Sequence, residues 1–371
     1  MASIKKRSDG IYRARYRDEA GKEHARHFQR KTDAQRWLDE VTTSIVTGAY
    51  VDPQVGRITF DQWWADYSKR QIWVRGTMDA AEQAAGCVTF GGMPMKSIRS
   101  SHVQQWVKAM SQPATSRSKG LAATTIRTRY NFVHMAFRAA VQDRVISTDP
   151  SDRIALPRTR RAESAMTIPT PEKVALALGS ASEVFQPFVA VCAFAGLRLG
   201  EAAGLQLRDV DFLRRTIRVA RQIQGQTSTT TEVVGPKQGS ERVVYVAQDL
   251  IDMLAAHVQR FGVWGEEEWL FGNFGDFWNR NSAGNQWRAI RKAADLEEFT
   301  LHDLRHFFAS GLIAAGCDVV TVQRALGHSS ATITLGTYSH LWPTAEDKTR
   351  TAAADLMASV RAADSLRTAT A

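Results

Sequence analysis

Two stretches rich in glycine, proline and polar residues divide this sequence, and they constrain its fold more than any other feature. The first is "TGAYVDPQVGR" (47–57) and the second is "STDPSDRIALPRTRRAESAMTIPTPEK" (147–173). Such composition is typical of connections between domains. A chain of 371 residues is also too long for one ordinary core. The sequence therefore predicts three domains, over residues 1–56, 57–160 and 161–371.

The first segment combines a basic hairpin with an amphipathic helix. Residues 1–31 hold ten basic and four acidic side chains, so they carry +6 of the chain's net charge of +10. In the strand-like run "YRARYR", alternation places Arg13, Arg15 and Arg17 on one face, opposite the apolar positions. We expect this face to lie in a DNA groove, and the alternative is a merely solvated strand face.

The other two segments are predicted to be largely helical. Residues 57–160 show the periodicity of several amphipathic helices, although 75–95 has no clear period. From about residue 167 the sequence predicts a helix over 172–195, then short strands, then further helices. The fold class is therefore α+β and multidomain: a small sheet-plus-helix module, a helical domain, and a mostly helical domain with a small antiparallel sheet.

Bulk properties favour an acidic partner and a reducing compartment. The sequence pI is near 9.7, which suits a polyanion such as nucleic acid. The three cysteines are widely spaced with no CxxC pair, which argues against a disulfide framework and a cysteine zinc site. The N-terminal "MASIKKRSDG" has no apolar core of a secretory signal. A cytoplasmic location is therefore expected.

The stretch "LHDLRHFFAS" (301–310) carries two histidines four residues apart, as in a zinc-binding helix. A metal here is unfavourable, because Arg305 would place a fixed positive charge beside the ion. No downstream ligand of the HExxH type is evident, although His328 and His340 exist. His302 and Arg305 are instead three residues apart and converge on one spot, where guanidinium and imidazole could hold a phosphate. We predict no metal, with His306 as a buttress.

Other candidate residues are individually weaker. Arg198 follows "FAG" at a turn between buried helices, and Glu201 could hold it there as a purely structural ion pair. Residues 174–291 contain eleven arginines but one lysine, Lys237, on a predicted hairpin turn. A lysine can release a proton where an arginine cannot, so it is a candidate general acid, and an exposed turn lysine is the alternative.

Tyr338 follows "LGH" and a predicted helix, and it is a candidate nucleophile. A free tyrosine has a pKa of about 10, so about a thousandth of it is ionised at pH 7. Two arginines and the histidines, His328 among them, would favour the phenolate. Alone, a tyrosine near the end of a chain would simply be a packing residue.

Taken in order, "GLRLGE", the hairpin lysine, "HDLRH", "LGH" and the following tyrosine resemble the tyrosine recombinase (phage integrase) family. The resemblance spans about residues 165–345. The whole layout is similar to that of three-domain integrases of temperate phages, with an arm-type DNA-binding domain, a core-binding domain and a catalytic domain. By match, the resemblance implies six catalytic residues: a nucleophile (Tyr338), phosphate ligands (Arg198 and Arg305), a general acid (Lys237) and assisting groups (His302 and His328). Glu201 is implied as a residue that supports this site.

The resemblance further implies a site-specific recombinase that integrates and excises phage DNA at attachment sites through a 3′-phosphotyrosyl intermediate. It implies no metal and no other cofactor. The implied partners are double-stranded DNA with core-type and arm-type sites, three further copies of the chain in a tetramer, a host DNA-bending factor and an excisionase. A type IB topoisomerase and a DNA-binding regulator remain open, and strand-exchange products from two DNA molecules would separate the three readings.

Overall fold

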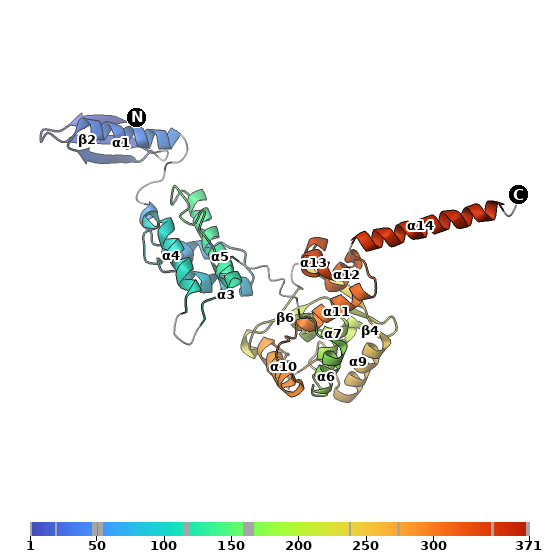
Figure 1. The fold of residues 1–371 in the computed structure, drawn as a ribbon. Helices are drawn as coiled ribbons and strands as arrows, with labels where there is room; N and C mark the ends of the chain where they lie inside the picture. Colours follow the sequence, from blue (N-terminus) through green and yellow to red (C-terminus); the bar gives the residue numbers. More distant parts are fainter. Residues whose placement is uncertain are drawn as a thin grey trace. The chain divides into compact units, whose positions relative to one another are not determined.

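The computed structural model describes residues 2–18, 21–46, 50, 55–113, 119–158, 167–236, 239–272, 275–342 and 345–368, and within the last range the side chains of 349–361. The chain divides into two compact units, Met1–Ala162 and Glu163–Ala371. Helices and small antiparallel sheets make up both (Figure 1), so the predicted α+β class is confirmed. In these ranges no helix combines the length and apolar character needed to cross a membrane.

The N-terminal part of the first unit is a three-stranded sheet with one helix. Strands β1 (Ser3–Lys6), β2 (Tyr12–Arg17) and β3 (Glu23–Phe28) are antiparallel in that order, and helix α1 (Lys31–Val46) follows. Tyr12 pairs with Phe28 and Arg17 with Glu23, which confirms the predicted hairpin. Strand β1 was not predicted, because its sequence "SIKK" is short and largely polar.

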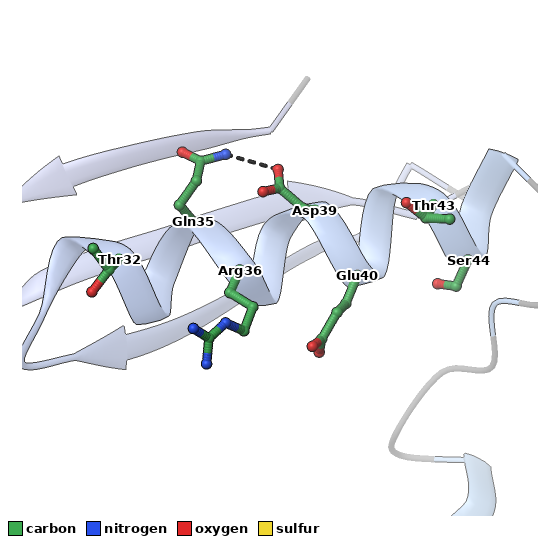
Figure 2. A pocket seen from close by; sticks show the side chains of 7 residues that line it. All are labelled: Thr32, Gln35, Arg36, Asp39, Glu40, Thr43 and Ser44. Atoms are coloured by element: carbon green, nitrogen blue, oxygen red, sulfur yellow. Dashed lines mark hydrogen bonds between the residues drawn. The ribbon is translucent and has the colours of Figure 1, made fainter.

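A small core joins β2 to α1. Ala14 and Tyr16 of β2 are buried against Ala34 and Leu38 of α1. The opposite face of β2 is exposed at its three arginines, as the alternation predicted. The outer face of α1 (Figure 2) forms a shallow hollow lined by Thr32, Gln35, Arg36, Asp39, Glu40, Thr43 and Ser44. Its mixed polar and charged lining is that of a solvated helix face.

Four helices form the second part of the first unit. They are α2 (Phe60–Lys69), α3 (Arg75–Ala85), α4 (Ser100–Ser111) and α5 (Ala123–Gln142), with short 3-10 turns at Val55–Arg57 and Met95–Ser97. Thr59 caps α2 through its hydroxyl, and Gln62 returns a side-chain bond to the Thr59 amide. Trp106 and Phe137, both fully buried, belong to the aromatic core between these helices.

Helix α3 occupies the first half of the segment without a clear period. Its buried face consists of Ala81, Ala84 and Ala85. Alanine contributes little to a hydrophobic pattern, although it is the strongest helix former. The spacing of apolar residues in this segment therefore indicates a helix only weakly.

The second unit contains the remaining elements. Its helices are α6 (Pro171–Gly179), α7 (Gln186–Phe194), α8 (Leu199–Ala203), α9 (Gln248–Phe261), α10 (Arg280–Ala294), α11 (Asp303–Ala314), α12 (Val319–Leu326), α13 (Ala331–Tyr338) and α14 (Ala345–Thr368). Strands β4 (Val210–Asp211), β5 (Thr216–Val219) and β8 (Arg242–Tyr245) form one antiparallel sheet, and β6 (Gln222–Gln224) and β7 (Glu232–Val234) form a two-stranded ribbon. In the described residues of this unit, 3-10 turns lie at Leu207–Asp209, Ser228–Thr230 and Ser339–Leu341.

Helix α7 lies at the centre of the second unit (Figure 1), where it packs against α6, α8, α9 and α11. Its residues from Pro187 to Ala193 are all buried. The prediction of one helix over 172–195 was wrong, because the chain leaves the helix at Gly179 and re-enters it at Gln186. The intervening "SASEVF" contains two serines, and Pro187 favours a first helical turn over a helix interior.

Candidate active site

Glu201 is the centre of an ion-pair cluster at the start of the short helix α8. Its side chain is 1% exposed, and each carboxylate oxygen accepts a hydrogen bond from an arginine. Arg198, at the N-cap of α8, donates from Nη1 to Oε1 at 2.6 Å, and Arg242, the first residue of β8, donates from Nη2 to Oε2 at 2.7 Å. The ion pair proposed from sequence between Arg198 and Glu201 is therefore present, with Arg242 as a second cation.

The electrostatics of this cluster keep Glu201 ionised. Burial alone raises the pKa of a carboxyl group, but the hydrogen bond and charge of Arg242, together with the charge of Arg198, bring the pKa of Glu201 down to about 2. Arg198 keeps 29% of its side chain exposed, whereas Arg242 keeps 5%. Arg198 is thus the arginine of the pair that solvent can reach.

Arg305 lies in the first turn of α11 and connects three elements. Its Nη1 donates to the carbonyl of Gly196 at 2.5 Å, and its Nη2 donates to the carbonyl of Leu326 at the end of α12. The guanidinium is also 3.9 Å from Glu201. Burial and the like charge of Arg198 lower the pKa of Arg305 to about 9, so it remains a cation at neutral pH.

Gly196 explains how α7 ends beside this arginine. Its φ of +63° is the left-handed conformation that commonly terminates helices, and a Cβ atom here would lie 2.4 Å from the ring of Phe308. The tight turn aims the Gly196 carbonyl at Arg305 and places Arg198 two residues later. The sequence "FAGLR" therefore acts as a turn that sets the position of both arginines.

Tyr338, the last residue of α13, is 1% exposed and packs among α11, α12 and α13. Its hydroxyl lies 2.7 Å from Nδ1 of His306, which is one turn along α11 from His302. The rings of His302 and His306 are 4.9 Å apart, as expected for two histidines on one helix face. The structure thus gathers the predicted tyrosine, both histidines and Arg305 on neighbouring elements.

The neighbouring cations favour the phenolate of Tyr338, as expected, but they do not decide its net pKa. Arg305 and Arg198 do lower the pKa of this hydroxyl, but burial outweighs them and raises it to about 12. Tyr338 is therefore a protonated phenol near neutral pH. Nucleophilic attack by this group requires removal of its proton during the reaction.

His302 and His328 flank the arginines as neutral imidazoles. Desolvation and the charges of Arg305 and Arg198 lower the pKa of His328 to about 4, and desolvation together with nearby cations also lowers that of His302. His328 is fixed through Nδ1, which lies 2.9 Å from the Thr334 hydroxyl, and its ring stacks 6.5 Å from that of Tyr338. Each neutral ring can donate one N–H to a phosphoryl oxygen.

The phage integrase family model matches residues 172–344, which include every residue of this cluster. The chain is 28% identical over 244 residues to the ICEBs1 integrase of Bacillus subtilis, an alignment that covers 60% of this chain and 63% of that protein. It is 23% identical to the putative prophage phiRv2 integrase of Mycobacterium tuberculosis, with 88% of each chain covered. Residues 172–344 therefore form a domain of the phage integrase family.

Solved structures agree with this family at the level of the fold. The Tn1549 transposon integrase in complex with circular intermediate DNA superimposes with a TM-score of 0.65 at 22% identity, covering 81% of this chain and all of that one. The lambda integrase tetramer bound to a Holliday junction gives 0.56 at 17% identity, covering 89% and 96%. The phage integrase family comprises tyrosine-type site-specific recombinases.

For two groups of predicted residues, the structure gives no relation to this cluster. Lys237 lies outside the described residues, in the connection from β7 to β8. The three arginines of β2 belong to the first unit, where Arg13 and Arg15 come within 3.6 and 3.7 Å of Glu23. Those pairs leave both guanidinium groups about half exposed. Their DNA-binding role therefore stays a prediction.

Arg242 is the site residue that sequence reasoning missed. Besides holding Glu201, its Nε donates to the carbonyl of Ala325 at 2.9 Å, which ties β8 to the end of α12. Gly327 leaves room for it, because a Cβ atom there would lie 2.9 Å from Cδ of Arg242. The sequence signal is weak: in "SERVVYV" this arginine reads as an ordinary polar position at the start of a strand.

No group of three potential metal ligands comes together within the described part of the chain. Of the two histidines on this helix face, His306 makes a hydrogen bond with the Tyr338 hydroxyl through Nδ1. The charge of Arg305 acts on both histidines, and that of Arg198 acts on His302. The arrangement supplies positive charge, neutral imidazoles and a hydroxyl, which are the groups needed for attack on a phosphodiester.

Proposed function

We propose that this protein is a site-specific DNA recombinase that integrates and excises phage DNA at attachment sites. The observation that carries the proposal is the Tyr338 hydroxyl, held 2.7 Å from His306 in the positive field of Arg305 and Arg198. A tyrosine in that position can attack the scissile phosphate and form a 3′-phosphotyrosyl bond. The phage integrase domain, and relatives named as prophage and transposon proteins, support the phage or mobile-element assignment.

The proposed roles follow from where charge develops. A phosphodiester under attack gathers negative charge on its non-bridging oxygens, and Arg198 and Arg305 stabilise that charge. His302 and His328 donate hydrogen bonds to the same phosphate, and Lys237 protonates the leaving 5′-oxygen. The phosphotyrosyl bond conserves the energy of the broken linkage, so rejoining requires neither ATP nor a metal ion.

Glu201 supports the reaction without touching DNA. Its carboxylate receives hydrogen bonds from Arg198 and Arg242, and it lies 3.9 Å from Arg305. One buried anion thus offsets part of the repulsion among three guanidinium groups. We propose that this arrangement keeps the two phosphate-binding arginines in place before DNA arrives, so that little reorganisation is needed during the reaction.

The remaining domains are proposed to select and organise the DNA. Residues 57–160 would bind core-type sites next to the cleaved bond, and residues 1–56 would bind arm-type sites through the exposed arginines of β2. The catalytic domain is assigned to 161–371. A tetramer on DNA is proposed by analogy with the lambda integrase tetramer bound to a Holliday junction. We further propose a host DNA-bending factor and an excisionase as partners. The protein would act on DNA in the cytoplasm of a bacterial host.

Strand exchange between two DNA molecules tests this function. Duplexes carrying the core site are obtained by covalent capture, in which the full-length protein selects from a library of nicked duplexes with random sequence. Two such duplexes of different length should yield recombinants of predicted lengths. A type IB topoisomerase would relax supercoiled DNA without recombinants, and a DNA-binding regulator would give neither product. Capture of no duplex by the wild-type protein would contradict the proposal.

A further inference from the structure

Among the residues that the structure describes, His306 is the only one that makes a hydrogen bond to the Tyr338 hydroxyl. It lies outside the six positions that the family resemblance assigns to catalysis. Its side chain comes from α11, whereas the tyrosine ends α13, so two helices must pack in register to bring the atoms within 2.7 Å. A contact of this length at the reacting atom is within the range needed for proton transfer.

We propose that His306 is a catalytic residue, the general base that accepts the Tyr338 proton during cleavage and returns it during rejoining. The inference rests on the proposed function and deepens it. In cleavage the O–H proton of Tyr338 moves to Nδ1 of His306 while the phenolic oxygen forms a bond to phosphorus. The bond from phosphorus to the 5′-oxygen breaks, and that oxygen takes its proton from Lys237. Rejoining reverses each transfer.

The direction of the hydrogen bond follows from the charges around the oxygen. Arg305 and Arg198 both exert positive potential on the Tyr338 hydroxyl. The lone pairs of the hydroxyl oxygen are therefore most stable when they face the arginines, and the O–H bond then points away from the arginines. Nδ1 of His306 lies 2.7 Å from the hydroxyl oxygen, and it accepts this proton in the tautomer that carries the ring proton on Nε2.

The environment of His306 also suits a base. The groups that act on it are His302, Asp303 and Arg305 of its own helix and Tyr338 of α13. Burial lowers its pKa, so the imidazole is neutral and able to accept a proton at neutral pH. The charge of Asp303 raises the pKa of His306 and so offsets part of this lowering, whereas no acid acts in this way on the pKa of His328. His306 is thus a better proton acceptor than His328, whose pKa falls to about 4.

The test compares single-turnover cleavage by the full-length wild type and His306→Asn. Asparagine places an amide near the position of Nδ1, so it can keep the hydrogen bond to Tyr338 but cannot accept the proton. The substrate is the captured nicked duplex with sulfur replacing the bridging 5′-oxygen, because a thiolate leaves without protonation. The pH dependence of the cleavage rate on this substrate then reports the deprotonation of the nucleophile, Tyr338. His340→Asn is the matched control, since that histidine is exposed and two residues beyond Tyr338.

We expect His306→Asn to bind DNA normally and to cleave about 10²- to 10⁴-fold more slowly than wild type at pH 7. Its rate should then rise about tenfold per pH unit up to pH 9, because only the preformed phenolate reacts below the raised pKa of Tyr338. The wild type and His340→Asn should be nearly independent of pH between 7 and 9. Cleavage by His306→Asn at the wild-type rate, or a slow rate that stays flat with pH, overturns the proposal.

A second measurement does not depend on folding of the variant. Wild-type cleavage of the sulfur substrate should decline about tenfold per pH unit on the acid side, once His306 becomes protonated. Because burial lowers the pKa of His306, this decline begins below pH 6.5, and a wild-type rate that stays constant from pH 9 to about 4 contradicts an imidazole base. Failure of the wild type to form any adduct is a different outcome, because it counts against the proposed recombinase function rather than against His306.

Discussion

Replacing Glu201 by glutamine removes the one buried carboxylate shared by the arginines of the site. The change keeps the size of the side chain and its ability to accept a hydrogen bond. It leaves Arg198, Arg242 and Arg305 without their common counter-charge. We expect the second unit to lose stability, because an unpaired buried charge is far more costly than a lost surface ion pair.

The size of the effect follows from the pKa of Glu201. A fall from 4.5 to about 2 on folding corresponds to about 3 kcal/mol of unfolding free energy at neutral pH. The side chain is 1% exposed, so solvent screening does not reduce this figure greatly. Breaking a buried ion pair by removing one partner typically costs about 3–5 kcal/mol, which agrees.

The same shift fixes the pH dependence. Because the folded state has the lower pKa, the contribution is fully present above pH 4.5 and is lost as the pH falls toward 2. The stability difference between wild type and Glu201→Gln should therefore be constant from pH 7 to 5. It should shrink to roughly half or less by pH 3.

Urea unfolding followed by hydrogen exchange of α7 peptides measures this difference within the second unit. Tryptophan fluorescence is unsuitable, because buried tryptophans occur in both units. The control is Glu183→Gln, since Glu183 accepts from Arg260 in an ion pair of 2.6 Å that is about two-thirds exposed. It should lose at most about 1 kcal/mol. Equal losses in the two variants, or a Glu201→Gln loss that does not shrink at low pH, would refute the reasoning.

Three further expectations concern other parts of the protein. Gly327→Ala should lower the unfolding free energy of the second unit by about 1–3 kcal/mol in the same exchange assay, because φ is +64° and the new Cβ atom meets Arg242. The control is Gly336→Ala on α13, where the new Cβ atom meets open space, and it should not lower the unfolding free energy. Replacing the three arginines of β2 by alanine in the full chain should weaken binding to arm-type DNA and flatten its salt dependence, and an unchanged salt slope in filter binding would count against that face. Lys237→Ala should slow cleavage of ordinary DNA but cleave the bridging-sulfur substrate at the wild-type rate, whereas equal defects on both substrates would indicate a binding role.

Local pattern was sufficient where one face of an element decides its structure. Alternation in "YRARYR" predicted the hairpin of β2 and β3 because the buried Ala14 and Tyr16 alternate with arginines. The same reasoning failed over 172–195, where both halves are apolar and the break depends on the turn at 180–185. It also failed for α3, whose core contacts are made by alanines.

The sequence predicted which residue types the candidate site contains, but not how burial and neighbouring charges together set their pKa values. The spacing in "HDLRH" correctly placed His302 and His306 on one face of a helix. The burial of Tyr338 depends on how α11, α12 and α13 pack, and this burial raises its pKa more than the neighbouring arginines lower it. Arg242 was missed for a related reason, since only the tertiary structure brings β8 to Glu201 and the end of α12.

Mapping the covalent adduct tests the central claim most directly. The full-length protein is incubated with the captured nicked duplex, denatured and digested with trypsin. Cleavage after Arg324 and Lys348 gives a peptide in which Tyr338 is the only tyrosine. Mass spectrometry should locate a 3′-phosphoryl nucleotide on Tyr338, and Tyr338→Phe should bind the same duplex without forming the adduct. An adduct on another residue, or an adduct formed by Tyr338→Phe, would contradict the account.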